Sequence, residues 1–186
     1  MTSVKITVLV LTWTLSWLTL LPASRPALAA EVANLCGKLD AAVKKKVEWE
    51  VRTLARKFTA QDRLDNETVF ALLTNHLWKN SEIHGAAFAF APVDNGREEV
   101  KSAPYVQRNA DRIIQKDLGA SCDYTAPEHP WYGSAVRLGK PVWSTPGFDQ
   151  AGGACLARHS MPVYSSGHDR RLIGVLTSDV LLPAAP

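Results

Sequence analysis

The chain has little cysteine, and no spacing of cysteine or histidine in it is typical of a metal site. Only three cysteines occur in 186 residues. Cys155 and His159 are four residues apart, but their segment is predicted to be a strand, where that spacing alone does not bring two ligands together. A glycine-rich phosphate-binding loop is also missing from the sequence. We therefore expect no bound metal and no cofactor.

Motifs of the common hydrolases are missing as well. No serine lies in a Gly-x-Ser-x-Gly elbow, and Gly152-Gly153 predicts a turn between strands. Asp149 and Asp179 could be imagined as a carboxylate pair for glycoside hydrolysis, but their separation along the sequence is poor evidence for one. We predict that the chain is not an enzyme, with a secreted hydrolase as the least favoured alternative.

Charge of one sign is not concentrated in the sequence. The formal net charge is +3, and it falls to +1 when Lys5 and Arg25 are removed with the N-terminal segment described below. The only basic run, Lys44-Lys45-Lys46, is best interpreted as the solvated face of a helix. Because nucleic-acid binding needs a concentrated basic surface, we expect no nucleic-acid partner.

No apolar run is long enough to cross a bilayer as a helix. The longest, from Ile6 to Leu21, has 16 residues, whereas a spanning helix needs about 20. Lys5 precedes this run, and the small residues of Ala27-Leu28-Ala29 follow it, which is the pattern of a cleaved secretory signal peptide over residues 1–29. The alternative is an uncleaved membrane anchor. Both interpretations place the remaining chain in the periplasm or outside the cell.

Residues 30–186 form one predicted domain with enough length for a hydrophobic core. Export to an oxidising compartment favours disulfides, and three cysteines allow one disulfide and one free thiol. We favour the pair Cys122–Cys155, because both residues flank the aromatic and acidic stretch described below, although spacing alone does not determine the pairing.

Two amphipathic helices are predicted first. Apolar residues recur at steps of three and four at Val32, Leu35, Leu39, Val43, Val47, Val51, Leu54 and Phe58. This nearly heptad seam either packs on the domain's own sheet or joins two chains in a homodimer. Asp65 or Asn66 can cap a second helix, in which His76 is expected at the edge of the core.

The apolar period changes to two after Gly85, which predicts strands. Turn signals separate the predicted strands, and Trp131 to Leu138 is predicted to be a short helix that ends at Gly139. The strands are predicted near residues 85–91, 105–108, 112–116, 142–145, 155–164 and 171–182. Two helices followed by an antiparallel sheet of five to six strands with one inserted helix give an α+β fold.

Aromatic and acidic residues gather between His129 and Asp179. Trp131 and Tyr132 have large apolar faces with polar tips, and Trp131 is the stronger candidate for a pocket, because adjacent helical residues cannot both point the same way. Asp179 interrupts a predicted strand, where aspartate is rare, and it needs a partner if it is buried. It either pairs with an arginine, caps a loop, or receives a ligand's ammonium group together with Asp149.

Several segments of the chain resemble those of Cache domains, the extracytoplasmic PAS-like sensors of bacterial chemoreceptors, histidine kinases and sigma-factor-regulating phosphatases. The resemblance covers residues 32 to 182 and rests on the order and spacing of its motifs. These motifs are Ile83–Pro92, Trp131-Tyr132, Trp143–Asp149 and Gly174–Val180. The resemblance implies a PAS-like fold and a signalling function.

Many Cache domains that bind amino acids or amines share a pattern of pocket residues, so the resemblance also implies a binding site. The positions that match this pattern are Tyr124, Trp131, Tyr132, Asp149 and Asp179. His129 stands where the pattern usually has arginine, and Gly147 stands where it has tyrosine. Arginine would hold a ligand carboxylate with two hydrogen bonds, whereas a neutral histidine offers one donor. This departure weakens the case for an α-amino acid and leaves an amine or an uncharged molecule open.

We therefore predict an exported, stand-alone Cache sensor domain that binds a small polar or cationic ligand, amine-like or amino-acid-like. The ligand-binding candidates are the five matching residues and His129. Such a domain would signal through a separate membrane-bound signalling protein. The alternative is a structural or protein-interaction module without a ligand, with the long first helix as its working surface.

Overall fold

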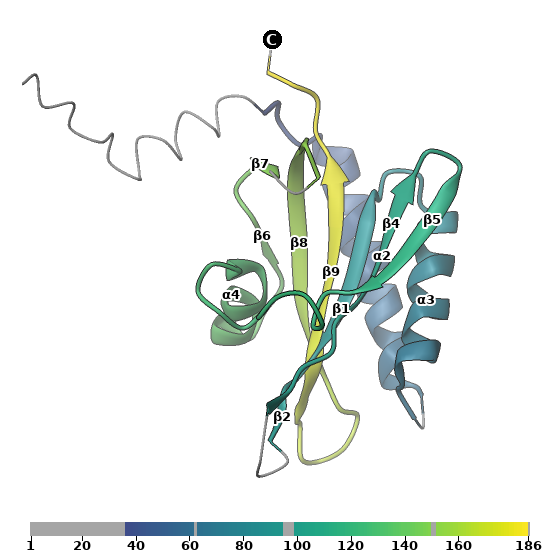
Figure 1. Ribbon diagram of the computed structural model, residues 1–186, viewed down its shortest axis with the longest axis vertical. Helices are drawn as coiled ribbons and strands as arrows, with labels where there is room; N and C mark the ends of the chain where they lie inside the picture. Colours follow the sequence, from purple (N-terminus) through teal and green to yellow (C-terminus); the bar gives the residue numbers. More distant parts are fainter. Residues whose placement is uncertain (1–35, 62, 95–98, 150–151, 186) are drawn as a thin grey trace, which may run out of the picture.

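The computed structural model describes residues 36–61, 63–94, 99–149 and 152–185 (Figure 1). The predicted signal peptide over residues 1–29 lies outside these ranges, as do Val32 and Leu35 of the predicted helical seam. Within the described residues, no helix is long and apolar enough to cross a membrane.

The first described helix, α2 (Ala41–Thr59), begins later than its apolar pattern. Asp40 caps it, because its Oδ1 accepts hydrogen bonds from the backbone N–H groups of Ala42 at 2.8 Å and Val43 at 3.0 Å. The buried face of the helix packs on the sheet and consists of Val47, Val51, Leu54, Ala55 and Phe58. The seam therefore contributes to the domain's own core, which was one of its two predicted roles.

The second helix, α3 (Asn66–Lys79), is capped by Asp65, whose Oδ1 accepts a hydrogen bond from the Thr68 N–H. His76 is buried on its inner face, with Nε2 3.3 Å from the Ser178 hydroxyl. Burial, helped by the positive charge of Lys57, lowers the pKa of His76 to about 4. His76 is therefore a neutral core histidine, as its position in the apolar pattern predicts.

A seven-stranded antiparallel sheet follows, in the order β5-β4-β1-β9-β8-β6, with β7 paired to β8. Its strands are β1 (Gly85–Phe90), β4 (Pro104–Asn109), β5 (Arg112–Asp117), β6 (Val142–Trp143), β7 (Gly147–Asp149), β8 (Ala154–Tyr164) and β9 (Leu172–Leu181). β2 (Val93–Asp94) and β3 (Glu99–Val100) form a separate small ribbon. The predicted α+β fold is confirmed, and the sequence did not predict the short strands β2, β3 and β7.

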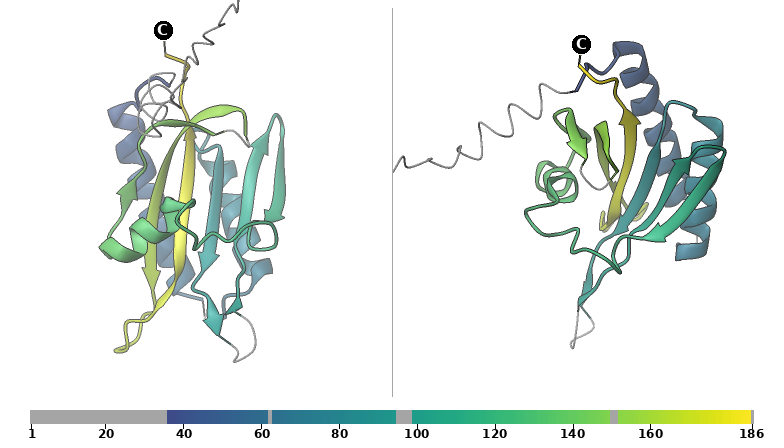
Figure 2. Two further views of the ribbon diagram at one scale, coloured as in Figure 1. Left: turned by 60° about the vertical axis from the view of Figure 1, so that its left-hand side comes forward. Right: turned by 45° about the horizontal axis from the view of Figure 1, so that its top comes forward.

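Helices cover the two faces of the sheet unequally (Figure 2). α2 and α3 pack on one face, and the short α4 (Pro130–Leu138) lies against the other. α4 begins with proline at its first turn and ends at Gly139, whose φ of 60° is the left-handed conformation that glycine adopts at a helix end. We call the side of the sheet that carries α4 the α4 face.

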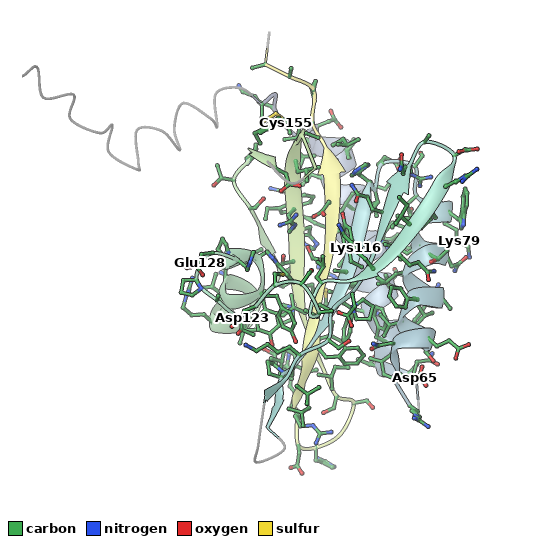
Figure 3. The ribbon with its side chains drawn as sticks, in the orientation of Figure 1. Asp65, Lys79, Lys116, Asp123, Glu128 and Cys155 are labelled. Carbon is green, nitrogen blue, oxygen red and sulfur yellow. A yellow bond between two sulfur atoms is a disulfide. The ribbon has the colours of Figure 1, made fainter. Side chains whose placement is uncertain are left out.

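The disulfide differs from the predicted one. Cys155 is bonded to Cys36, with their Cα atoms 5.4 Å apart, and Cys122 is a free, half-buried thiol. Figure 3 shows the bond beside the first residue of the described chain. The predicted pair Cys122–Cys155 is wrong because Cys122 follows β5, at the opposite edge of the sheet from β8. The segment before α2 instead runs beside the start of β8, where Cys36 also bridges to Ala184.

Candidate ligand-binding site

Three predicted site residues gather in one aromatic cluster under α4, consisting of Tyr124, Trp131 and Tyr132. The Tyr124 ring centre lies 6.2 Å from that of Trp131 and 5.1 Å from that of Tyr132. Tyr124 is fully buried, and its hydroxyl donates a hydrogen bond to the Phe90 carbonyl at 2.8 Å. This bond ties the loop before α4 to β1 and fixes the inner wall of the cluster.

The two adjacent aromatics of α4 have different environments. Tyr132 is buried with Ala135 and Val175 in a small core between α4 and β9. Trp131 is half-buried and packs against the edge of this core, with its ring nearly perpendicular to that of Tyr132. Tyr132 is therefore mainly a packing residue, and Trp131 keeps part of its surface open to a ligand.

Asp179 is buried in the middle of β9, with 1% of its surface exposed, and it is paired with Arg158 on β8. The guanidinium donates two hydrogen bonds to the carboxylate, from Nε to Oδ1 at 2.5 Å and from Nη2 to Oδ2 at 3.3 Å. Burial disfavours the charged guanidinium, but the Asp179 carboxylate outweighs that effect and raises the pKa of Arg158. Of the predicted roles for Asp179, the structure shows the pairing with an arginine.

Tyr105 on β4 completes what we call the ionic cluster, consisting of Tyr105, Arg158 and Asp179. Burial raises the pKa of the Tyr105 hydroxyl, and the nearby Asp179 carboxylate raises it further. The ring can reach this position because Gly85, opposite Asp179 in β1, has no side chain. A methyl group at Gly85 would collide with the Tyr105 hydroxyl.

The other two predicted site residues, Asp149 and His129, lie outside both clusters. Asp149 on β7 is half-buried, and its Oδ2 accepts a hydrogen bond from the Gly152 N–H at 3.0 Å. Its charge acts on both Arg158 and Tyr105, so its carboxylate lies near the ionic cluster. His129 precedes α4, half-buried, and its side chain makes no capping hydrogen bond within the described part of the chain.

The aromatic and ionic clusters share the α4 face but lie apart along β9. Val175 packs in the aromatic cluster's core, and Asp179 follows four residues later on the same face, about 13 Å away at the usual rise per residue of a strand. Between them lies Thr177, buried, with its hydroxyl accepting a hydrogen bond from Ser160 at 3.3 Å. The arrangement is a polar floor with aromatic rings at one end and an ion pair at the other.

This arrangement suits binding. Within the described residues, no group of three or more histidine, cysteine, aspartate or glutamate side chains could hold a metal ion. The strongest polar groups are a paired carboxylate and guanidinium, which can hold a charged or polar group in place.

The sequence did not identify Tyr105 and Arg158 as members of the site. One signal for Arg158 was present, because it is a charged residue in the middle of a predicted strand, as is Asp179. No comparable signal singled out Tyr105, whose role depends on the space above Gly85.

Comparisons with known proteins agree with the fold. A family model described as methyl-accepting chemotaxis protein-like, first PDC sensor domain, matches residues 69–184. No curated protein sequence matches the chain.

Among solved structures, the chain is similar to the extracellular domain assigned to a histidine kinase, soHK1S-Z6, at 23% identity and a TM-score of 0.62. It is also similar to the ligand-binding domain of the amino-acid chemoreceptor PctC of Pseudomonas aeruginosa PAO1 in complex with GABA, at 15% identity and a TM-score of 0.55. Both matches cover 84% of this chain and 59% of the other.

A third similar structure is the ligand-binding domain of the Campylobacter jejuni chemoreceptor Tlp3 in complex with 4-methylisoleucine. Its identity is 15% and its TM-score 0.54, and the match covers 74% of this chain and 51% of that one. The chain thus spans less than two thirds of the length of these structures. By the family model that covers most of its length, and as the resemblance to Cache domains predicts, the chain belongs to the methyl-accepting chemotaxis protein-like first PDC sensor domains.

Proposed function

We propose that this chain is an extracytoplasmic sensor domain that binds a small molecule on the α4 face, between the aromatic cluster and the ionic cluster. The observation that carries the proposal is the buried Asp179–Arg158 pair, which lies on the same sheet face as a half-buried tryptophan. Buried charges are costly, and charged groups with a perturbed pKa are typical of functional sites.

The charges favour a ligand with an ammonium group. Two carboxylates, Asp149 and Asp179, and one guanidinium, Arg158, leave one net negative charge in this region. Asp179 already has a partner, so Asp149 is the carboxylate with capacity for a ligand cation. The open face of Trp131, at the other end of this face, suits an apolar part of the ligand.

A zwitterionic amine fits this region best. Its carboxylate can reach Arg158, which has 28% of its side-chain surface exposed, and its ammonium group can meet Asp149 beside the ionic cluster, while the rest of the molecule extends along the α4 face toward Trp131. The structures solved with GABA and 4-methylisoleucine show that similar domains of other proteins bind amino acids. With histidine at position 129, Arg158 takes over the role of anion partner in this proposal.

The proposal includes a separate membrane-bound signalling protein that reads the ligand-bound state. Its support is that similar domains come from a histidine kinase and from chemoreceptors, whose sensor domains work in signal transduction. Co-purification of the exported chain with a membrane protein from its own cells, increased by the ligand, would test this part.

Thermal melting against a panel of amines, amino acids and simple carboxylates tests the binding site. At a hundredfold excess over Kd, a ligand stabilises the fold by about 2.7 kcal/mol, which raises Tm by at least about 5 °C. We expect amino acids or amines to produce this shift and simple carboxylates to fail.

Trp131→Ala should greatly weaken the shift. Trp78→Ala is the matched control, because Trp78 lies on α3, away from the α4 face, with 60% of its surface exposed. If no panel compound changes Tm, the protein-interaction module becomes the better interpretation.

A further inference from the structure

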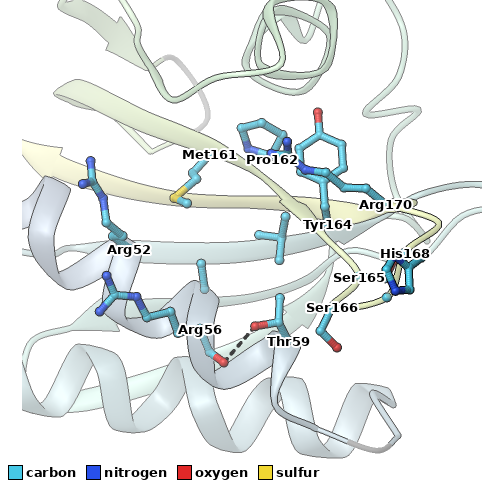
Figure 4. Close-up of a pocket in the computed structure, with 13 residues that line it drawn as sticks. Arg52, Arg56, Thr59, Met161, Pro162, Tyr164, Ser165, Ser166, His168 and Arg170 are labelled. Carbon is cyan, nitrogen blue, oxygen red and sulfur yellow. Dashed lines mark hydrogen bonds between the residues drawn. The ribbon is translucent and has the colours of Figure 1, made fainter.

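A concave surface lies beside α2, at the end of the domain that carries the hairpin between β8 and β9 (Figure 4). It is a groove of about 670 Å³ between the C-terminal half of α2 and the hairpin that joins β8 to β9. Its polar lining comes from Arg52, Arg56 and Thr59 of α2 and from Tyr164, His168 and Arg170 of the hairpin. We call it the basic groove.

The charged side chains that line the groove are all basic. It includes three guanidinium groups and one imidazole, and the described residues that line it include no carboxylate. Across the described part of the chain, none of the three arginines forms an ion pair. The nearest acidic residue in the hairpin, Asp169, is exposed, and its backbone carbonyl accepts a hydrogen bond from the Ser165 hydroxyl.

The arginines reach the groove from two elements, and the side chains of Arg52 and Arg56 extend from α2 away from the hairpin (Figure 4). Arg52 and Arg56 are four residues apart on α2, so they lie on the same face of the helix, where two like charges repel each other. Arg170 approaches from the hairpin, and its guanidinium carbon lies 4.7 Å from the centre of the Tyr164 ring. This stacking holds Arg170 in place beside the groove.

We propose that the basic groove binds a small multivalent oxyanion, such as a phosphate group or a di- or tricarboxylate. Guanidinium groups match the geometry of such oxyanions with paired hydrogen bonds. The volume falls within the range of small-molecule sites, and a bound anion would relieve the repulsion between Arg52 and Arg56.

The position of the groove favours a dissolved anion over a lipid headgroup. The hairpin lies at one end of the domain, whereas Cys36 and the C-terminal residues lie together at the other end (Figure 1). A chain held at a membrane through either end would therefore present the groove to solvent. No residue of the aromatic cluster or of the ionic cluster lines the groove, although its Tyr164 hydroxyl lies near Gly139 at the end of α4, so the groove is distinct from the proposed ligand site.

Isothermal titration of the protein with inorganic phosphate and with citrate, against potassium chloride at equal ionic strength, tests this proposal. We expect saturable binding of at least one of the two anions. In the double variant Arg52→Gln/Arg56→Gln, affinity should fall about tenfold for each guanidinium removed. Arg112→Gln is the matched control, because Arg112 is an exposed arginine of β5 far from the groove.

Circular dichroism should show that the variants keep the fold, because the replaced side chains are exposed. Absence of binding by both anions, or equal affinity in the double variant, would overturn the proposal. A flotation assay with anionic vesicles tests whether the groove binds a lipid headgroup instead of a dissolved anion. If the protein binds vesicles through these arginines but binds neither free anion, the groove is a membrane contact and the proposal is wrong.

Discussion

Arg158 and the three arginines of the basic groove occupy contrasting environments. Arg158 is largely buried and paired with Asp179 through two hydrogen bonds. Arg52, Arg56 and Arg170 line an open groove in which the described residues supply no carboxylate. A buried charge must have a partner to be tolerated, so Arg158 belongs to the fold as well as to the binding site. An exposed charge without a partner costs the fold little and remains available to a ligand.

The largest expected effect comes from breaking the buried pair. Asp179→Asn leaves the Arg158 guanidinium without a counter-charge and should reduce the free energy of unfolding by about 3 kcal/mol, near the lower end for buried pairs because Arg158 keeps some exposure. In urea unfolding, the double variant Asp179→Asn/Arg158→Met should recover most of this loss. Strictly additive effects of the two substitutions would show that the pair is not coupled.

Histidine shows the same contrast between buried and exposed groups. The pKa of His76 is lowered to about 4 by burial, below its ordinary value of 6.5. Between these values the unfolded chain binds a proton that the folded chain does not, so stability falls as the pH falls through this window. The loss from pH 7 to pH 4.5 should be about 2 kcal/mol.

His76→Gln should remove this part of the acid sensitivity, measured by urea unfolding at several pH values. Burial also lowers the pKa of His159 to about 4, so His159 still contributes to the acid sensitivity of that variant. Trp78→Ala, at an exposed position of the same helix, is the control, and the same pH slope is expected as in the unsubstituted protein. An equal change of slope in both variants would contradict the role given to His76.

Gly85 permits Tyr105 to approach the buried pair. Gly85→Ala should displace Tyr105 and lower the free energy of unfolding by at least about 1 kcal/mol, because the added methyl group has no free space. Gly133→Ala is the matched control, since nothing lies within 4 Å of the new methyl group on α4. It should stabilise the protein by about 0.5 to 1 kcal/mol through helix propensity. Destabilisation by Gly133→Ala alone would contradict this account of the two glycines.

The smallest effect on folding is expected in the basic groove. Arg56→Gln should change the free energy of unfolding by less than about 0.5 kcal/mol, because its exposed side chain forms no ion pair in the described part of the chain. Chemical denaturation beside the Arg158 variants measures this directly. A loss as large as that of Asp179→Asn would mean that the groove arginines also support the fold.

Local signals explain why most of the fold could be predicted. Asp65 and Gly139 mark helix ends through their own backbone chemistry, and the apolar periods separate helices from strands. Trp131 and Tyr132 could be identified because they are adjacent aromatic residues in the first turn of one helix, whereas Tyr124 was predicted from the resemblance to Cache domains. β7 has three residues, too few for a period to appear.

Pairing between distant strands explains what could not be predicted. Tyr164 lies opposite Leu172, and an uninterrupted register from there would pair Arg158 with Ser178. A β-bulge between Val163 and Tyr164 shifts the register by one residue and pairs Arg158 with Asp179 instead. Since a shift of one residue moves a side chain to the other face, the ion pair depends on the bulge. The order of strands likewise decides which cysteine meets Cys155.

The central claim is that a small ligand binds on the α4 face beside Trp131. Its most direct test is an NMR titration that follows the indole N–H resonances of protein labelled with ¹⁵N-tryptophan, using the panel compound that raises Tm most. We expect a saturable shift of the Trp131 resonance at the same ligand concentration that stabilises the fold, while the resonance of Trp78 on α3 stays unchanged. A stabilising compound that leaves Trp131 unmoved would contradict it.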